Sequence, residues 1–246
     1  MSSKPTLKLD WCSHEAAKYA VEKWHYSQSL PVGKMVKVGA WENGNFIGCV
    51  LFSYGANQNI GKPYGLPQVE VCELVRVALS KHMAPVSKIG SIAIKFLKKQ
   101  SPGIRLIVSY ADTKQGHLGS IYQAMGWLYQ GYFDGSMRVV VNGRKMHGRQ
   151  AYSLYGTTRP PGSFNVPAGG KHKYLMPLDD EIRKRIEPLR KPYPKRVTSI
   201  ASDAPVNQTG EGGAIPTVTL SSTSGQTHGN GIPRPGDTAG VRWHAG

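Results

Sequence analysis

The sequence predicts an α/β fold in which a mixed sheet is flanked by helices, with a basic extension after the domain. Apolar runs typical of strands alternate along the chain with amphipathic helical segments. The dipeptides Asn43-Gly44 and Asn142-Gly143 lie between apolar runs, which is typical of tight β-hairpins. One helical segment separates two strand-like runs, an order typical of a right-handed crossover between parallel strands.

The first predicted helix covers SHEAAKYAVEKWH, residues 13–25. Ser13 suits the N-cap, where a side-chain oxygen accepts from an otherwise unpaired N–H group. Apolar residues then recur on one face, at Ala17, Ala20, Val21 and Trp24. The helix is expected to end at His25 and Tyr26, and a hairpin centred on Asn43-Gly44 follows.

Further segments complete the predicted domain. We expect a strand at VEVCELVRVAL (69–79) and an amphipathic helix at SKIGSIAIKFLKK (87–99). The apolar run RLIVSYAD (105–112) lies between two helical segments, which favours a buried parallel strand. A short helix is expected at HLGSIYQAMGW (117–127), and a second hairpin at Asn142-Gly143 follows it.

Charge and composition divide the chain into three parts. Residues 1–158 form the expected compact domain, residues 159–198 the basic extension, and residues 199–246 a tail rich in Gly, Ser, Thr and Pro. The tail has too few large apolar residues to offset the entropy of ordering, so we expect it to be disordered. The whole chain carries a net charge of +16, which favours a polyanionic partner, with nucleic acid first.

Composition also argues against several classes of protein. No apolar run is long enough to span a membrane, and the first residues, MSSKPTLKLDW, lack the apolar core of a secretory signal. Cys12, Cys49 and Cys72 match no metal or redox spacing and are expected as buried apolar residues. We therefore expect a protein of the reducing cytoplasm. The sequence leaves open whether it forms a homodimer.

The segment LVRVALSKHMAPVSKIGSIAIKFLKK (74–99) resembles the central motif of the GNAT N-acetyltransferases. In those enzymes a loop after a strand leads into a helix whose N-terminus holds the pyrophosphate of acyl-coenzyme A, since free N–H groups and the helix dipole attract anions. The glycine of the motif is present, while Ser87 stands where Gln or Arg is usual. The resemblance implies a coenzyme A site formed by Arg76, Val77, Leu79, Ser87, Lys88, Gly90 and Ser91.

A narrower resemblance covers about residues 10–196 and is to the Mom family of bacteriophages. It is carried by WHYSQSLP, VRVAL, SYADTKQGHLGSIYQAMGWLYQG, NGRKMHGR and KPYPKR. That family has an acetyltransferase-like fold and converts adenine in phage DNA to an N6-carbamoylmethyl (acetamido) form, which protects the DNA from host restriction. The resemblance implies a DNA-modifying transferase of the host cytoplasm, with residues 1–158 as the catalytic domain and double-stranded DNA as the partner.

The same resemblance implies a catalytic group of His25, Tyr26, Asp112 and Tyr122, and Ser109 is added from its place in the strand. Histidine titrates near neutrality and suits a general base, or it bonds the last helix carbonyls. Tyr26 suits stacking on a flipped adenine or donating a proton to a leaving thiolate, or it is an aromatic at the edge of the core. Asp112 ends an expected parallel strand, where such sheets bind ligands, or it caps the next helix. Tyr122 suits protonation of the coenzyme A sulfur, or it packs in the core.

The donor of the transferred group is left open between chemical alternatives. Acetyl-coenzyme A in a simple acyl transfer gives N6-acetyladenine, whereas a carbamoylmethyl group joins N6 through its methyl carbon and carries an amide nitrogen. A glycine-derived donor supplies both the carbon and the nitrogen. Assistance by iron, bound to His25, Tyr26 and Asp112, is a further hypothesis.

Affinity for DNA is expected from the basic extension, because lysine and arginine neutralise phosphates. The expected residues are Lys171, Lys173, Arg183, Lys184, Arg185, Arg190, Lys191, Lys195 and Arg196. Further candidates are Lys95, Lys98, Lys99, Arg144, Lys145 and Arg149. A mixed-charge helix face is the alternative for 181–191. Two other functions stay open: an acetyl-coenzyme A-dependent N-acetyltransferase acting on a protein or small-molecule amine, and a non-catalytic basic DNA-binding protein.

Overall fold

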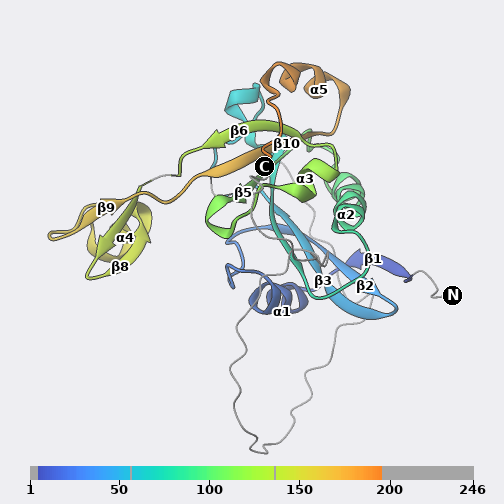
Figure 1. Ribbon diagram of the computed structural model, residues 1–246, viewed down its shortest axis with the longest axis horizontal. Helices are drawn as coiled ribbons and strands as arrows, with labels where there is room; N and C mark the ends of the chain where they lie inside the picture. The colour runs from blue at the N-terminus through green and yellow to red at the C-terminus, as the bar shows by residue number, and fades with distance from the viewer. Residues whose placement is uncertain (1–4, 56, 136, 196–246) are drawn as a thin grey trace, which may run out of the picture.

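A seven-stranded mixed sheet forms the centre of the molecule in a computed structural model that describes residues 5–55, 57–135 and 137–195 (Figure 1). Its strand order is β1-β2-β3-β4-β5-β10-β6. The strands are β1 (Leu7–Trp11), β2 (Met35–Glu42), β3 (Asn45–Ser53), β4 (Val71–Leu79), β5 (Leu106–Asp112), β6 (Leu128–Phe133) and β10 (Lys171–Pro177). The predicted mixed sheet flanked by helices is confirmed.

Helices cover both faces of this sheet (Figure 1). The helices are α1 (His14–Trp24), α2 (Val86–Gln100), α3 (Ser120–Ala124), α4 (Gly148–Tyr155) and α5 (Asp180–Ile186), with 3-10 turns η1 (Lys62–Tyr64), η2 (Gln68–Glu70), η3 (Thr113–Gln115) and η4 (Glu187–Leu189). α1 packs on β3 and β4, and α2 packs on β1, β2 and β3. Alternate residues of a strand face opposite sides, so Val108 of β5 packs with α5 on the α1 face while Ile107 packs on the α2 face.

α1 forms where the sequence predicts it. The Ser13 hydroxyl accepts from the N–H of Ala16 at 3.0 Å, and Ala17, Ala20 and Val21 are fully buried. His25 follows in an extended conformation and ends the helix. The chain then forms a loop, residues 25–31, that is bonded to β4 and carries the first predicted catalytic residues.

β4 and β5 are the one parallel pair among the described strands, and α2 connects them as the predicted crossover. Their ladder covers only Val71–Glu73 and Leu106–Val108, although β4 continues to Leu79 and β5 to Asp112. Beyond Glu73 the facing edges of the two strands are therefore unpaired. Unpaired backbone N–H and C=O groups at such an edge need other partners, and an extended ligand can supply them.

The structure departs from the prediction near the end of the domain. Residues 171–177, expected within the basic extension, form β10 between β5 and β6 in the main sheet. The hairpin at Asn142-Gly143 is present, but its strands β7 (Arg138–Val141) and β8 (Arg144–His147) join β9 (Phe164–Val166) in a separate sheet. The expected boundary at residue 158 thus lies inside the segment that forms this second sheet. An alternating pattern identifies a strand but not its partner, which is why these pairings were not foreseen.

Smaller differences have local causes. The sequence prediction omitted β1, and the helix expected at 117–127 is limited to Ser120–Ala124. Gly119 and Gly126 have φ values of 80° and 72°, which end the helix on both sides. All three cysteines are buried and unpaired, as predicted. Arg196 and the tail lie outside the described residues, and no described helix is long and apolar enough to cross a membrane.

Candidate active site

Side chains rather than backbone groups bridge the unpaired edges of β4 and β5. Ser109, fully buried on β5, donates to the carbonyl oxygen of Leu74 on β4 at 2.9 Å. The hydroxyl groups of Ser109 and Tyr122 share a hydrogen bond of 2.8 Å. Burial raises the pKa of Tyr122 to about 12, so its phenol keeps its proton at neutral pH. A protonated tyrosine from α3 therefore reaches the place where the strands separate.

A β-bulge brings Glu73 and Arg76 to the same face of β4. The register between β3 and β4 shifts at Val75, the extra residue on β4, so the alternation of side chains is reset there. Arg76 donates from Nε and Nη2 to the carbonyl oxygen of Ser29, each at 3.3 Å, and from Nη1 to that of Val75 at 2.7 Å. Arg76 thus ties the loop after α1 to β4, and no ion pair joins it to Glu73 in the described ranges.

Glu73 lies where the pairing of β4 and β5 ends. Its carboxylate packs against Gly55, because a Cβ added there would lie 2.4 Å from Glu73 Oε2. Burial raises the pKa of Glu73, and the positive charges of Lys171, Arg76 and Lys173 oppose that rise. Glu73 was not among the predicted site residues, since a lone glutamate in an apolar strand is equally well explained as an ion-pair partner.

His25 is a neutral ring whose Nδ1 is already occupied. The backbone N–H of Ser27 donates to this nitrogen at 3.1 Å, and Ser27 Oγ lies 2.8 Å from it. Nδ1 is therefore unprotonated, and the neutral ring carries its proton on Nε2. Burial, with the charges of Arg76 and His117, lowers the pKa of His25 to about 4. This arrangement makes His25 a hydrogen-bond donor and does not suit the general-base role expected from the sequence.

Tyr26 connects the loop after α1 to the end of β5. Its ring packs on that of His25 with centroids 4.3 Å apart, and the His117 ring lies 5.8 Å away in an edge-on arrangement. Burial and the charge of Asp112 raise the pKa of Tyr26, although half of its surface, 52%, is exposed. Asp112 itself accepts from the N–H of Lys114 at 3.0 Å and caps η3. His25, Tyr26 and Asp112 therefore gather at one edge, with His117 as an unforeseen neighbour.

β10 adds two lysines to this face of the sheet. The ammonium group of Lys173 lies 5.2, 5.8 and 5.5 Å from the ring centroids of Tyr64, Tyr110 and Phe133. Lys171 lies 5.8 Å from the ring of Tyr110. Cation–π contacts of this kind hold a lysine against the sheet and limit its reach toward a distant phosphate. Both residues were expected to bind DNA, and the structure places them beside Glu73 instead of on a separate extension.

Arg76, expected at the acyl-donor site, instead holds the loop after α1. The other expected acyl-donor residues lie on the opposite face or around the start of α2. Val77 and Leu79 pack in the α2 half of the core, and Ser87, Lys88 and Ser91 lie in the first turns of the helix. No side chain caps this helix end, so its first N–H groups are open to an anion.

Gly90 has a packing role in addition. A Cβ at this position would lie 2.7 Å from the sulfur of Met125, so a glycine lets α2 and α3 approach closely. In the preceding loop, the N–H groups of Met83 and Ala84 donate to the Glu42 carboxylate at 2.9 and 2.8 Å. Glu42 therefore holds the loop that leads into α2.

Several predicted DNA-binding residues of the α5 segment, residues 179–195, are already paired. Arg185 and Arg190 lie 2.5 Å from the carboxylates of Glu181 and Glu187, and Arg183 lies 4.0 Å from Asp180. Lys184, Lys191 and Lys195 are exposed and form no ion pair within the described part of the chain. Arg196 lies outside the described residues.

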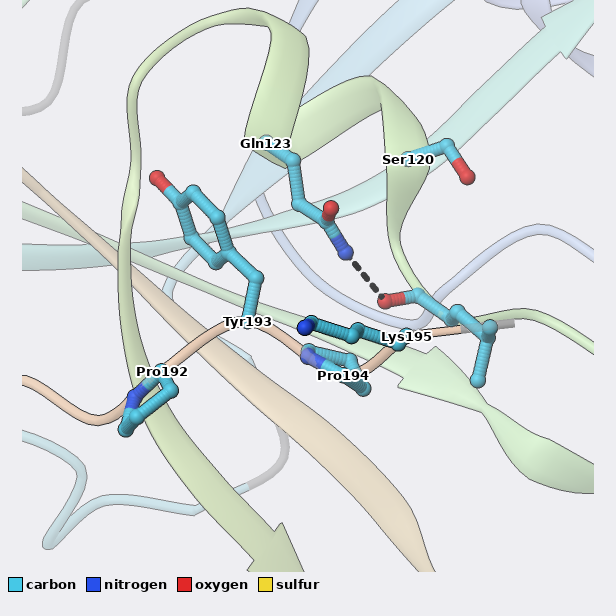
Figure 2. Close-up of a pocket in the computed structure, with 7 residues that line it drawn as sticks. Ser120, Gln123, Pro192, Tyr193, Pro194 and Lys195 are labelled. Carbon is cyan, nitrogen blue, oxygen red and sulfur yellow. Dashed lines mark hydrogen bonds between the residues drawn. The ribbon is translucent and has the colours of Figure 1, made fainter. Parts of the chain in front are cut away.

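A hollow of about 500 Å³ lies between α3 and the end of the α5 segment (Figure 2). It is lined by Leu118, Ser120, Gln123, Pro192, Tyr193, Pro194 and Lys195. Figure 2 shows the Gln123 amide donating to the carbonyl oxygen of Leu118, at 3.2 Å. The lining includes none of the predicted catalytic residues, so we do not place the chemistry in this hollow.

The residues expected to hold iron do not fit a metal site. Among the residues that the structure describes, no three His, Cys, Asp or Glu side chains are grouped closely enough to bind a metal ion. The Nδ1 atom of His25 accepts from Ser27, and Asp112 accepts from the N–H of Lys114. We therefore propose no iron site.

Known proteins resemble this chain in sequence and, more distantly, in structure. The model of the Mom protein family matches residues 6–195. Methylcarbamoylase mom of Escherichia phage Mu is 23% identical over 205 residues, covering 77% of this chain and 84% of that protein. Solved structures with some similarity include FeeM, an N-acyl amino acid synthase from uncultured soil microbes, at 12% identity and a TM-score of 0.43, covering 74% of this chain and 94% of that one.

An N-acetyltransferase from Staphylococcus aureus Mu50 is 11% identical with a TM-score of 0.40, covering 70% of this chain and 98% of that one. The family match spans the main sheet, every predicted catalytic residue and the second sheet. It confirms the resemblance inferred from the sequence, and the chain belongs to the Mom protein family.

Proposed function

We propose that this chain is a transferase that modifies adenine at N6 in double-stranded DNA, placing there a carbamoylmethyl group that protects phage DNA from restriction in the host cytoplasm. The phage Mu relative is named a methylcarbamoylase. The observation that carries the proposal is that Arg76 holds the loop of His25 and Tyr26 against β4, three residues beyond Glu73, where β4 and β5 separate. Ser109, bonded to Leu74 of β4, holds Tyr122 of α3 at the same separation.

Glu73 is the proposed general base. The exocyclic amine of adenine is conjugated into the ring and is a poor nucleophile, so a base must take its proton as the new bond forms. The raised pKa of Glu73 makes its carboxylate a stronger base than an exposed one. In this proposal His25 donates from Nε2 to the base or the donor, and Tyr26 stacks on the flipped adenine.

Tyr122 is the proposed proton donor to the leaving group. Its phenol is protonated at neutral pH, and the hydrogen bond with Ser109 fixes its hydroxyl between the strands. Ser109 is in turn held by the carbonyl oxygen of Leu74. Ser109 is thus a positioning residue for Tyr122, while Arg76 positions the loop that carries His25 and Tyr26.

Acyl-coenzyme A is the proposed carrier of the donor. The unpaired edge of β4 suits an extended arm that contains amides, and the uncapped first turn of α2 suits a pyrophosphate. Coenzyme A, when bound, supplies an activated group on a thiol that leaves easily. Acetyl transfer alone would give N6-acetyladenine, so the carbamoylmethyl product needs a donor that also contributes nitrogen, and a glycine-derived group does so. Attack of N6 on the carbonyl carbon of its thioester, with the thiol leaving, gives the isomeric N6-glycyladenine, so the carbamoylmethyl product further requires that N6 end bonded to the methylene carbon and the amine to the carbonyl.

Mass spectrometry of nucleosides tests the proposal. DNA from cells that produce the chain should contain a modified deoxyadenosine. Its mass gives the composition of the transferred group, and its fragmentation distinguishes the carbamoylmethyl group from the isomeric glycyl group. Glu73→Gln should lower its yield at least about 100-fold, since general bases contribute that much or more. Glu22→Gln, the same change on the exposed side of α1, is the matched control.

Unmodified DNA from cells with soluble, folded protein would contradict the proposal, and so would full activity of Glu73→Gln. In the first case acetyl transfer to a protein or small-molecule amine becomes the better explanation. Binding of acetyl-coenzyme A by the purified protein then becomes the next measurement.

A further inference from the structure

A small second unit projects from the main body of the protein (Figure 1). This arm, residues 138–166, contains β7, β8, α4 and β9 and has its own core of Val139, Val141, Met146 and Ala151. The two chain segments that join it to the body touch at Gly135 and Gly169, since a Cβ at Gly135 would lie 1.9 Å from the carbonyl oxygen of Gly169. Neither the proposed chemistry nor the main core requires the arm.

The arm and its connections contain no acidic residue. From Gly135 to Leu178 the sequence has no Asp or Glu. The same stretch holds seven lysines and arginines: Arg138, Arg144, Lys145, Arg149, Arg159, Lys171 and Lys173. Such a stretch cannot neutralise its positive charge from within.

Among the described residues, α4 covers one face of the small sheet, and the other face carries some of this charge. α4 covers the face that holds Val139, Val141 and Met146. The register pairs Arg138 with His147, and Val140 with both Lys145 and Phe164, so these side chains share the opposite face. Phe164 is 61% exposed there. An exposed aromatic among cations is typical of surfaces that bind nucleic acid.

Lys114 brings a further positive charge from the main body. Its aliphatic chain packs on Gly169, where an added Cβ would lie 2.4 Å from Lys114 Cε. Arg138 and Lys145 lie on adjacent strands of the same face. Burial, then the charges of Lys114 and Arg138, lower the pKa of Lys145, in keeping with that arrangement. None of the three forms an ion pair within the ranges that the structure describes. Like charges gathered without an acid are stabilised by a bound anion.

We propose that Lys114, Arg138 and Lys145 form a phosphate-binding site through which the arm holds the DNA backbone beside the base that is modified. The inference rests on the proposed function, because DNA is its assigned substrate. Lys114 follows Asp112 by two residues and donates its N–H to that carboxylate, so the phosphate site adjoins the candidate active site. In this proposal the arm, which lies outside the catalytic sheet, positions the DNA.

Binding of a short fluorescent DNA duplex, measured by anisotropy across a salt series, tests the proposal. The variant Arg138→Ala with Lys145→Ala should bind about tenfold more weakly near 0.1 M salt, and the salt slope should fall by about 2. The matched control is Arg183→Ala with Lys184→Ala, which removes the same two residue types from α5. We expect the affinity and the salt slope of this control to fall by less than half as much as in the arm variant.

Equal binding by wild type and the arm variant would overturn the proposal, as would an equal loss in the α5 control. A wild-type protein that does not bind the duplex would also overturn it. Loss of acetyl-coenzyme A binding in the arm variant would show that these cations bind the acyl donor and not DNA, which would also overturn the proposal. DNA that is bound through the arm but contains no modified deoxyadenosine would contradict the proposed function alone.

Discussion

The arm and the α5 segment are both basic, but their charges are arranged differently. Two carboxylates of the α5 segment, those of Asp179 and Glu181, lie 2.8 and 2.7 Å from Arg105 of the main body. Arg185 and Arg190 of the segment have carboxylate partners of their own. The arm offers no carboxylate to its cations. Density of basic residues in the sequence favours the α5 segment as a DNA surface, whereas unpaired charge favours the arm.

The difference teaches that a count of basic residues does not measure the charge available to a partner. An arginine paired with a carboxylate releases little energy on meeting a phosphate, because it must first leave its partner. The α5 arginines also contribute to packing, since Arg185 donates to the carbonyl oxygen of Tyr64 at 3.0 Å. Arginines of the α5 segment thus stabilise the fold, whereas Arg138 of the arm stays available to a partner.

Core substitutions should show the largest contrast between the two regions. Ile182 of α5 is fully buried with Leu106, Val108 and Leu175 of the main sheet, so Ile182→Ala should lower the free energy of unfolding by about 2–5 kcal/mol. Met146 is buried only in the arm's own cluster, so Met146→Ala should open the arm locally. Urea denaturation measures the first effect and amide hydrogen exchange the second.

An equal loss of global stability in both variants would show that the arm folds as part of the main core. The two regions would then not be separable, and the contrast would have to rest on charge alone. Exchange protection that is lost in the arm and retained in β4 and β5 is the expected result.

Much of the fold followed from the sequence, because local signals determine local elements. Ser13 as a cap, the turn at Asn43-Gly44 and the apolar faces of α1 and α2 are each encoded within a few residues. The place of β10 between β5 and β6 is not encoded locally, since its partners lie about 40 to 70 residues earlier in the chain. Register across such a distance depends on the packed core.

The candidate site was predictable only in part for the same reason. His25, Tyr26 and Asp112 do meet, but the backbone bond from Ser27 that sets the ring tautomer of His25 is visible only in three dimensions. Glu73 gains its significance from the point at which β4 and β5 separate. Sequence alternation predicts the two strands without indicating where their pairing ends.

Acid should loosen the α5 segment through its carboxylates, whereas in the arm it acts on His147, whose Nδ1 caps α4 by accepting from the N–H of Arg149. Hydrogen bonds from Arg105 hold the pKa of Asp179 below its ordinary value of 3.8. A carboxylate with a lowered pKa contributes stability above its unfolded value and loses it as the pH falls through the folded value. The α5 segment should therefore loosen below about pH 4, whereas the arm has no carboxylate to titrate. Amide NMR signals followed over an acid titration measure both regions at once.

Arg105→Gln sharpens this test, because it removes the bonds that lower the pKa of Asp179. The loosening of the α5 segment should then begin at a higher pH than in the wild type. Arm signals away from α4 and its cap His147 that broaden before those of α5 would contradict the assigned difference in charge pairing.

The smallest expected effect is on the salt slope of DNA binding when a single lysine is removed beside the arm or from α5. Lys114→Ala removes one of the unpaired cations beside the arm, and Lys184→Ala removes an exposed lysine from α5. If a phosphate lies against Lys114, its loss should lower the salt slope of duplex binding by about 1, since each phosphate contact contributes about 0.9. Lys184 has the same charge, but its neighbours Arg183 and Arg185 are each paired with a carboxylate, so the slope should change by less when it is removed. Both lysines lie outside the arm, so neither substitution should unfold it. Equal salt slopes in the two variants would mean that DNA binding depends on total charge and not on whether a cation is paired with a carboxylate.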